Sequence, residues 1–229
     1  MKVRYEGLAL MNGREKVFDG LSLRIPSGTI ACFYGPTGSG KTSLLLATGG
    51  FMRISAGEVF VGGTSVRQHP HAARRLTGLG LIPGFNPLVE NLSIRENLFF
   101  QCRLYQVAAP ARRVLQLLQQ FDLEGAAAKW PDALTQPETL RAGLAMAMVH
   151  DPAVLLVDEP SHALTSQELA EAWRYLERLK AEGKTLILSS HSLWVAHQSD
   201  LAVKLPQGKE VPADEYAALG LAGHQEALA

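Results

Sequence analysis

The stretch Gly35 to Thr42 reads G-P-T-G-S-G-K-T and matches the spacing G-x-x-x-x-G-K-[S/T]. It follows an apolar run, T-I-A-C-F-Y, which predicts a buried strand, and it precedes the small and apolar residues 41–49, which predict a helix. Glycines let successive backbone N–H groups surround an anion, and a helix N-terminus adds positive potential. The stretch therefore predicts a phosphate-binding loop rather than a plain glycine turn with a solvated lysine.

The residues of this loop have distinct predicted roles in holding a nucleotide. Lys41 is expected to reach the β- and γ-phosphates, and its side chain is expected to be exposed until phosphate arrives. Thr42 is expected to place its hydroxyl on Mg²⁺, an ion that keeps most of its waters and takes few protein ligands. The candidate binding residues are Gly35, Pro36, Thr37, Gly38, Ser39, Gly40, Lys41 and Thr42.

Two further runs carry polar residues where buried strands are predicted to end. The run V-L-L-V-D-E-P contains Asp158 and Glu159, and the run L-I-L-S-S-H ends in His191. Open α/β sheets bind ligands at the carboxyl ends of strands, so Asp158 is predicted to hold Mg²⁺ through a water and Glu159 to polarise an attacking water. His191 is predicted to donate a hydrogen bond to a γ-phosphate. Alone, such residues are more often solvated; the glycine loop makes the site the favoured interpretation.

The rest of the chain alternates between strand and helix patterns, which predicts an α/β fold with an inserted helical lobe. Residues 17–25 and 57–61 read as strands, and residues 166–183 as a helix with one apolar face. Long helical patterns occupy residues 83–150. We predict a single domain over residues 1–229, with an α/β core at 1–84 and 151–205, a helical lobe at 85–150 and a C-terminal tail at 206–229.

Composition limits the kinds of protein this chain can be. Of its 229 residues 47% are hydrophobic and its formal net charge is +0, which predicts a globular unit with a full core. The neutral balance argues against a nucleic-acid partner, which usually selects a basic excess. The start, M-K-V-R-Y-E-G, lacks the apolar region of a signal peptide, and no apolar run is long enough to span a membrane. We therefore expect a cytoplasmic location, with membrane contact only through a partner.

In this order, the loop, the acids and the histidine resemble an ATP-binding cassette (ABC) ATPase, the nucleotide-binding subunit of ABC transporters, over almost the whole chain. The resemblance makes the loop a Walker A motif, V-L-L-V-D-E a Walker B motif with Glu159 as catalytic glutamate, and His191 the switch histidine. It implies a P-loop NTPase core, with a parallel sheet and an N-terminal antiparallel β part, that binds and hydrolyses ATP with Mg²⁺. It also implies a transmembrane permease partner, a peripheral place on the cytoplasmic face of the membrane, and a homodimer or heterodimer of cassettes.

One motif departs from the family pattern. Residues 134–138 read L-T-Q-P-E where the family carries L-S-G-G-Q, after an aromatic-proline pair kept here as W-P. In the family this signature caps the γ-phosphate held by a second, head-to-tail cassette. Thr135 can replace the serine, but Pro137 lacks an N–H and Glu138 brings an anion near an anion. Like-charge repulsion on the order of 1 to 4 kcal/mol predicts a poor ATP cap.

Other departures concern loops that line the family's nucleotide site. Gly84 stands in place of the Q-loop glutamine, with Asn86 as the available substitute, and the D-loop ends in Thr165 instead of aspartate. The aromatic residue that stacks on adenine in the family falls at Asn12. Stacking is therefore expected to be lost unless Tyr5 or Phe18 takes over, and base recognition to be loose.

Two functions remain open from sequence. Glu159 and His191 favour a hydrolysing cassette that drives a membrane subunit. A degenerate cassette that binds ATP and regulates a competent partner is favoured by Pro137, Glu138, Gly84 and Thr165. A repair or translation cassette is disfavoured, because those carry two cassettes or an inserted arm. The run N-L-S-I-R-E-N-L-F-F-Q-C-R-L-Y at 91–105 resembles ABC-2 type exporter cassettes. Its Phe99, Phe100 and Tyr105 are predicted to form lobe core or, alternatively, a docking surface for the membrane subunit.

Overall fold

The computed structural model of the chain describes residues 3–12 and 15–210. The strands are β1 (Val3–Asn12), β2 (Glu15–Ile25), β3 (Ile30–Tyr34), β4 (Ala56–Val61), β5 (Thr64–Ser65), β6 (Thr77–Leu79), β7 (Val154–Asp158), β8 (Thr185–Ser190), β9 (Leu201–Lys204) and β10 (Lys209–Glu210). The helices are α1 (Lys41–Thr48), α2 (Pro70–Leu76), α3 (Ile94–Leu104), α4 (Pro110–Gln120), α5 (Gln136–Ala147), α6 (Ser166–Ala181) and α7 (Leu193–Gln198), with 3₁₀ turns η1 (Glu124–Ala126) and η2 (Pro131–Ala133).

These strands form two sheets. One has the order β10-β9-β3-β8-β7-β6, and every pairing from β9 to β6 is parallel. The other has the order β2-β1-β4-β5 and is antiparallel. The strands of the parallel sheet are short and buried, because helices cover both faces. This is the α/β architecture predicted from the strand and helix patterns.

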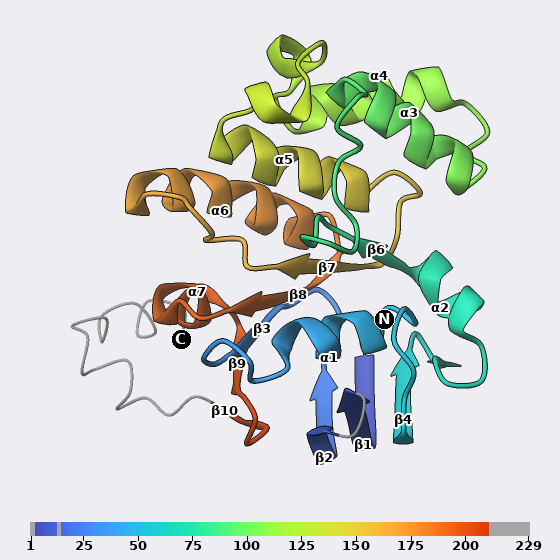
Figure 1. Cartoon of the computed structure of the whole chain (residues 1–229), viewed down its shortest axis with the longest axis vertical. Coiled ribbons are helices and arrows are strands. Elements are labelled where there is room, and N and C mark those ends of the chain that lie inside the picture. The colour runs from blue at the N-terminus through green and yellow to red at the C-terminus, as the bar shows by residue number, and fades with distance from the viewer. Residues whose placement is uncertain (1–2, 13–14, 211–229) are drawn as a thin grey trace.

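The layers explain where the apolar residues go. Figure 1 shows α1 between the two sheets, with α5 and α6 on the other face of the parallel sheet and α3 and α4 beyond α5. One core, with Phe33, Leu44 and Val59, fills the space around α1. A second core, with Leu117 and Leu144, joins the helical lobe to the parallel sheet. In this arrangement β3, β7 and β8 end side by side at the same edge of the sheet.

Helix α6 shows how the sequence pattern fixes the packing. Its apolar residues Leu169, Trp173, Leu176 and Leu179 recur at helical spacing, and all four are buried. The predicted apolar face of this helix is therefore confirmed. No helix within residues 3–12 and 15–210 combines the length and the apolar character needed to cross a bilayer.

The start of the expected tail is more ordered than predicted. Residues after Pro206 turn back into β10, which pairs with β9 through Lys209 and Lys204. The expectation of a weakly patterned tail from Pro206 is therefore wrong for residues 206–210. Residues 211–229 lie outside the described residues.

Candidate nucleotide-binding site

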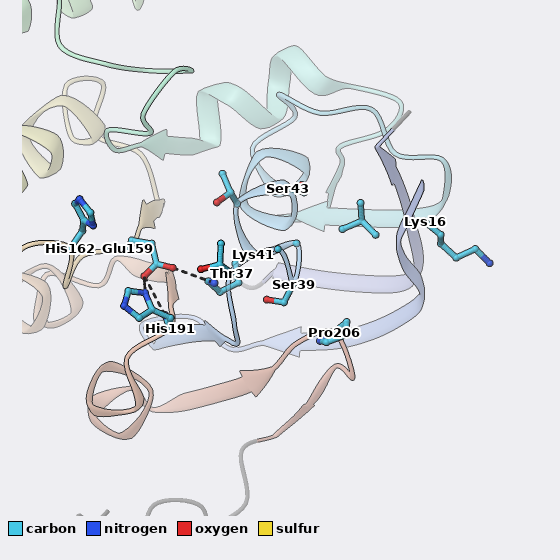
Figure 2. A pocket seen from close by; sticks show the side chains of 13 residues that line it. Lys16, Thr37, Ser39, Lys41, Ser43, Glu159, His162, His191 and Pro206 are labelled. Carbon is cyan, nitrogen blue, oxygen red and sulfur yellow. Dashed lines mark hydrogen bonds and ion pairs between the residues drawn. The ribbon is translucent and has the colours of Figure 1, made fainter. Parts of the chain in front are cut away.

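The glycine loop connects β3 to α1 and opens onto a cavity of about 770 Å³ (Figure 2). Gly40, the residue before α1, has a φ of 87°, and a Cβ there would lie 2.4 Å from Val17 Cγ1, so only glycine fits. No side chain caps α1. The first-turn N–H groups of a helix have no intrahelical partner, so this uncapped turn faces the cavity ready to bind an anion.

Lys41 lies at the base of this cavity, already surrounded by oxygen atoms. Its Nζ donates to the carbonyl oxygens of Gly35 (2.9 Å) and Pro36 (3.1 Å) and lies 3.3 Å from Oε1 of Glu159. Its side chain is only 7% exposed. The expectation that Lys41 is exposed until phosphate arrives is therefore wrong, because two carbonyl oxygens and the Glu159 carboxylate already hold the ammonium group.

Thr42 lines the same cavity and is hydrogen-bonded to Asp158 at the end of β7. The Thr42 hydroxyl donates to both carboxylate oxygens of Asp158, at 3.0 and 3.1 Å, and the Ser189 hydroxyl donates to the same carboxylate. Burial raises the pKa of Asp158, and the hydrogen bonds from Ser189 and Thr42 partly oppose this. A hydroxyl oxygen beside a carboxylate is the hard-oxygen donor set that Mg²⁺ prefers, so these residues fit that ion.

Glu159 and His191 form the wall opposite the loop. The backbone leaves β7 at Glu159 with a φ of 43°, held by a hydrogen bond from its N–H to the Ser189 carbonyl oxygen (3.0 Å). Its Oε2 lies 2.8 Å from His191 Nδ1 and accepts from the His191 N–H (3.2 Å). The carboxylate thus lies between Lys41 and His191, as the dashed lines in Figure 2 show.

Three chain segments, the loop at residues 35–42, the acids at 158–159 and His191, therefore bring the predicted site residues together. Ser189 was not singled out from sequence, although its place beside Asp158 in the β7–β8 register could have indicated it. Sequence reasoning also missed His162 and Pro206, which line the cavity. His162 follows the Walker B acids closely, whereas Pro206 arrives from a segment that was expected to be tail.

Three loop residues with expected roles do not line this cavity. Gly84 lies in an exposed turn, and Asn86 donates its amide to the carbonyl oxygens of Leu79 (3.2 Å) and Gly80 (3.0 Å). Asn86 as a substitute for the Q-loop glutamine is therefore wrong, because its amide holds the loop to β6. Thr165 caps α6, and its hydroxyl is bonded to Glu168.

The two aromatic residues offered as a stacking platform are buried elsewhere. Tyr5 is 1% exposed, bonds Thr48 through its hydroxyl (2.8 Å) and packs edge-on against Phe33. Phe18 is 3% exposed and lies against Gly40. Both alternatives are wrong, because these rings belong to the core around α1. The antiparallel sheet instead contributes Lys16 and Val17 to the cavity, and Figure 2 shows Lys16 pointing away from it.

The L-T-Q-P-E stretch forms the closed N-terminus of α5. Thr135 accepts from the N–H of Glu138 (3.3 Å), while the Glu138 carboxylate accepts from the Thr135 N–H (2.9 Å) and hydroxyl (3.1 Å). Lys129 pairs with the same carboxylate at 2.7 Å, and this hydrogen bond is the main reason that the pKa of Glu138 is lowered. Lys129 therefore compensates the charge of Glu138, from which the sequence predicted repulsion of a phosphate. Pro137 has no N–H. In the first turn of α5, Gln136 is therefore the residue whose backbone N–H has no acceptor among the described residues.

A glycine loop between a parallel strand and a helix, with a hydroxyl, two carboxylates and a histidine around it, defines a P-loop nucleotide-binding protein. The chain belongs to the ABC transporter family, which matches residues 18–162. It is 27% identical to the arginine transport ATP-binding protein ArgV of Corynebacterium glutamicum, covering 88% of this chain and 85% of ArgV.

Two further relatives are larger proteins. The chain is 32% identical to the daunorubicin resistance ATP-binding protein DrrA3 of Streptomyces coeruleorubidus, covering 86% of this chain and 62% of DrrA3. It is 35% identical to the Nod factor export ATP-binding protein I of Burkholderia pseudomallei, covering 76% of this chain and 58% of that protein. The chain thus spans less than two thirds of the length of these two relatives.

Solved cassette structures share the fold. The dimeric structure of the bacterial ABC transporter cassette MJ0796 superposes with a TM-score of 0.78 at 25% identity, covering 92% of this chain and 97% of that one. A second dimeric structure of MJ0796, in a post-hydrolysis state bound to ADP and Pi, gives the same TM-score. The predicted fold class is confirmed. The chain is an ABC-type ATPase cassette, the ATP-binding subunit of an ABC transporter, of a kind that forms dimers.

Proposed function

We propose that this cassette binds ATP with Mg²⁺ and hydrolyses it to drive a separate membrane permease from the cytoplasmic face of the membrane. One observation carries the proposal: Lys41, Thr42, Glu159 and His191, from distant parts of the sequence, line a single cavity at the edge of the parallel sheet, and Asp158 is hydrogen-bonded to Thr42 beside it. We assign nucleotide binding to residues 35–42 with Asp158, metal binding to Thr42 and Asp158, and catalysis to Glu159 and His191.

The contacts in the free chain suggest how binding prepares the site. When the phosphates reach the uncapped N-terminus of α1, Lys41 exchanges Glu159 and the loop carbonyls for phosphate oxygens. Glu159 then loses its cationic partner and is free to accept a proton from the attacking water, while His191 donates to the γ-phosphate. Mg²⁺, when bound, neutralises charge that develops on the phosphates. The Ser189 hydroxyl orients Asp158 beside Thr42.

The permease and the direction of transport are part of the same proposal. Export is favoured because the Nod factor export protein (35%) and the daunorubicin resistance protein DrrA3 (32%) have a higher sequence identity to this chain than ArgV (27%). Exposed apolar side chains support a docked permease: Phe100 (44% exposed) and Leu104 (60%) lie one turn apart on α3. Of the other two aromatic candidates, Phe99 packs against the lobe core and Tyr105 stacks on His150.

The segments of the chain have separate tasks in this proposal. The core at residues 1–84 and 151–205 binds the nucleotide. The lobe at residues 85–150 carries both α3, with its exposed apolar side chains, and the start of α5. The tail at 206–229 has no proposed task beyond the contribution of Pro206 to the cavity wall.

The second cassette is expected to matter more here than usual. We propose that α5 caps a partner's ATP poorly, since Pro137 and the bond between Thr135 and Glu138 leave few donors. A homodimer would contain two poor caps. A heterodimer with an intact signature would contain one competent site, built on this chain's Lys41 and Glu159. The alternative function, a regulatory cassette with little turnover, rests on the same closed α5.

The test is a pair of substitutions in the assembled complex. Glu159→Gln in this chain should lower ATP turnover by about 10²- to 10⁴-fold, the usual contribution of a positioned base, while ATP still binds. The matching change in the partner cassette should cost little. If the partner's glutamate matters more, this chain is the regulatory cassette. Equal turnover in Glu159→Gln and parent would contradict the assignment of Glu159.

A further inference from the structure

A second large cavity lies at the opposite end of α1 from the phosphate-binding loop. It has a volume of about 780 Å³ and is formed by the loop that follows α1, by the connection from β5 to α2 and by α2 itself. None of the residues that line it belongs to the nucleotide cavity. Figure 1 shows α2 and β4 on this side of the molecule, next to the end of α1.

The charge around this cavity is of one sign. Arg53, Arg67 and Arg74 line it, and no aspartate or glutamate is among its described lining residues. The carboxylate of Glu58 accepts from the backbone N–H of Arg67 (3.1 Å) and from the Ser65 hydroxyl (2.9 Å). Three guanidinium groups therefore line this cavity with no carboxylate among its described lining residues.

Many N–H groups of these three arginine side chains make no hydrogen bond with a described residue. Arg74 donates through Nε and Nη2 to the Gly50 carbonyl oxygen (3.0 and 2.8 Å), which holds it in place over the Phe51 ring. Arg67 makes one long hydrogen bond, from Nη1 to the Gly57 carbonyl oxygen (3.4 Å). Arg53 is exposed and makes no hydrogen bond or ion pair with any described residue. The cavity therefore presents guanidinium N–H groups that lack an acceptor, some on Arg74, which is held in place, and some on Arg53, which is not.

Apolar side chains also line part of the cavity. Phe51, Ile54 and Val66 line it, and Phe85, which is 47% exposed, packs edge-on against Phe51 at 5.8 Å. Guanidinium forks match the oxygens of phosphate, and exposed aromatic rings favour an apolar group beside them. The matching ligand has a phosphate group attached to an apolar portion.

We propose that this cavity binds an organic phosphate, with the phosphate held by Arg53 and Arg67 and the apolar portion against Phe51 and Phe85. The site goes beyond ATP hydrolysis and uses none of its residues. Two sources share this chemistry: the headgroup of an anionic phospholipid, and a small soluble phosphate compound.

The experiment uses the full chain with its nucleotide cavity saturated by ADP, so that Lys41 cannot capture the probe. One arm measures binding to phosphatidylglycerol vesicles against phosphatidylcholine vesicles, and the other measures binding of phenyl phosphate. Arg53→Glu and Arg67→Glu should each weaken binding at least about tenfold, since each removes charge-assisted hydrogen bonds. Arg112→Glu, the same charge change at an exposed position on α4, is the matched control. Arg53→Gln tests the loss of charge alone.

A loss of probe binding at this cavity can be told apart from damage to the nucleotide site. Binding of vesicles alone identifies a lipid headgroup, binding of phenyl phosphate alone identifies a soluble ligand, and either supports the proposal if the cavity variants lose it. ADP affinity and ATP turnover should be unchanged in Arg53→Glu, which shows that the fold and the catalytic site are intact. The proposal is overturned if neither probe binds the parent, or if the cavity variants bind as well as Arg112→Glu.

Discussion

The N-termini of α1 and α5 are both places where a helix can bind an anion, but only the N-terminus of α1 is open to one. Before α1, Gly40 supplies a left-handed turn and no side chain, so the first-turn N–H groups face a cavity. Before α5, Thr135 and Glu138 bond each other's backbone N–H groups, and Lys129 pairs with the carboxylate. One helix end is open to a phosphate, and the other is already occupied by the chain's own anion.

The difference teaches that a helix N-terminus is an anion site only when its own residues leave it open. Both ends have the same dipole, worth about 0.3 to 1 kcal/mol for a nearby charge at an exposed site. What differs is the residue at the cap and the third helical residue, which are glycine and serine at α1 but threonine and glutamate at α5. The same reciprocal bonding closes α6, through Thr165 and Glu168.

Removing Lys41, the cation at the open N-terminus of α1, should have the largest effect on ATP binding. Lys41→Ala should weaken ATP binding by about 2 to 4 kcal/mol, or roughly 30- to 1000-fold, because charge-assisted hydrogen bonds to phosphate are lost. Isothermal titration with ATP measures this. Lys16→Ala is the control, since Lys16 lies at the same cavity but points away (Figure 2). Equal affinity for Lys41→Ala and Lys16→Ala would break the assignment of the open end.

Removing the Glu138 carboxylate, which closes the N-terminus of α5, should lower the stability of the fold. Glu138→Ala removes the acceptor of the Thr135 N–H and the partner of Lys129, so the free energy of unfolding at neutral pH should fall by about 1 kcal/mol. Urea titration measures it. Glu168→Ala, in a capping pair without a lysine, should cost less. If the two variants are equal, Lys129 adds nothing to the closure of α5.

The pH dependence of this loss has a definite sign. The pKa of Glu138 is lowered in the folded chain, so its stabilisation is present above the ordinary pKa of glutamate and is lost as pH falls through the folded value. Parent and Glu138→Ala should therefore converge in stability on acidification. A gap that persists at low pH would show that the carboxylate charge is not what closes the helix.

The smallest effect should come from changing the base. The nucleotide cavity is lined on its sheet side by Lys16 and Val17, with no phenylalanine, tyrosine or tryptophan among its described lining residues. Stacking on an aromatic ring is worth roughly 1 to 3 kcal/mol, so without it ATP and GTP should bind within about fivefold of each other. Competition titrations with ATP, GTP and inorganic triphosphate measure this. A preference for ATP above a hundredfold would mean that an aromatic residue reaches the base.

Local sequence patterns predicted most of the structure around the open N-terminus of α1, but little of that around the closed N-terminus of α5. The strand, glycine loop and helix of α1 follow each other in sequence, and parallel topology then requires Asp158 and His191 to reach the same edge. The bond from Lys129 to Glu138 depends on the η2 turn between them, which no periodicity indicates. The burial of Tyr5 and the amide contacts of Asn86 depend likewise on how the antiparallel sheet and the loop after β6 pack.

The central claim is that α5 is closed to a partner's phosphate while α1 is open. The most direct test is ATP-dependent self-association, measured by sedimentation, in a Glu159→Gln background that prevents hydrolysis. We expect this variant to bind ATP yet remain monomeric, and the further change of Pro137 and Glu138 to glycine to produce an ATP-dependent dimer at least about tenfold tighter, since it frees first-turn donors. Dimerisation of Glu159→Gln alone, as tight as that of the variant with both glycines, would contradict the account.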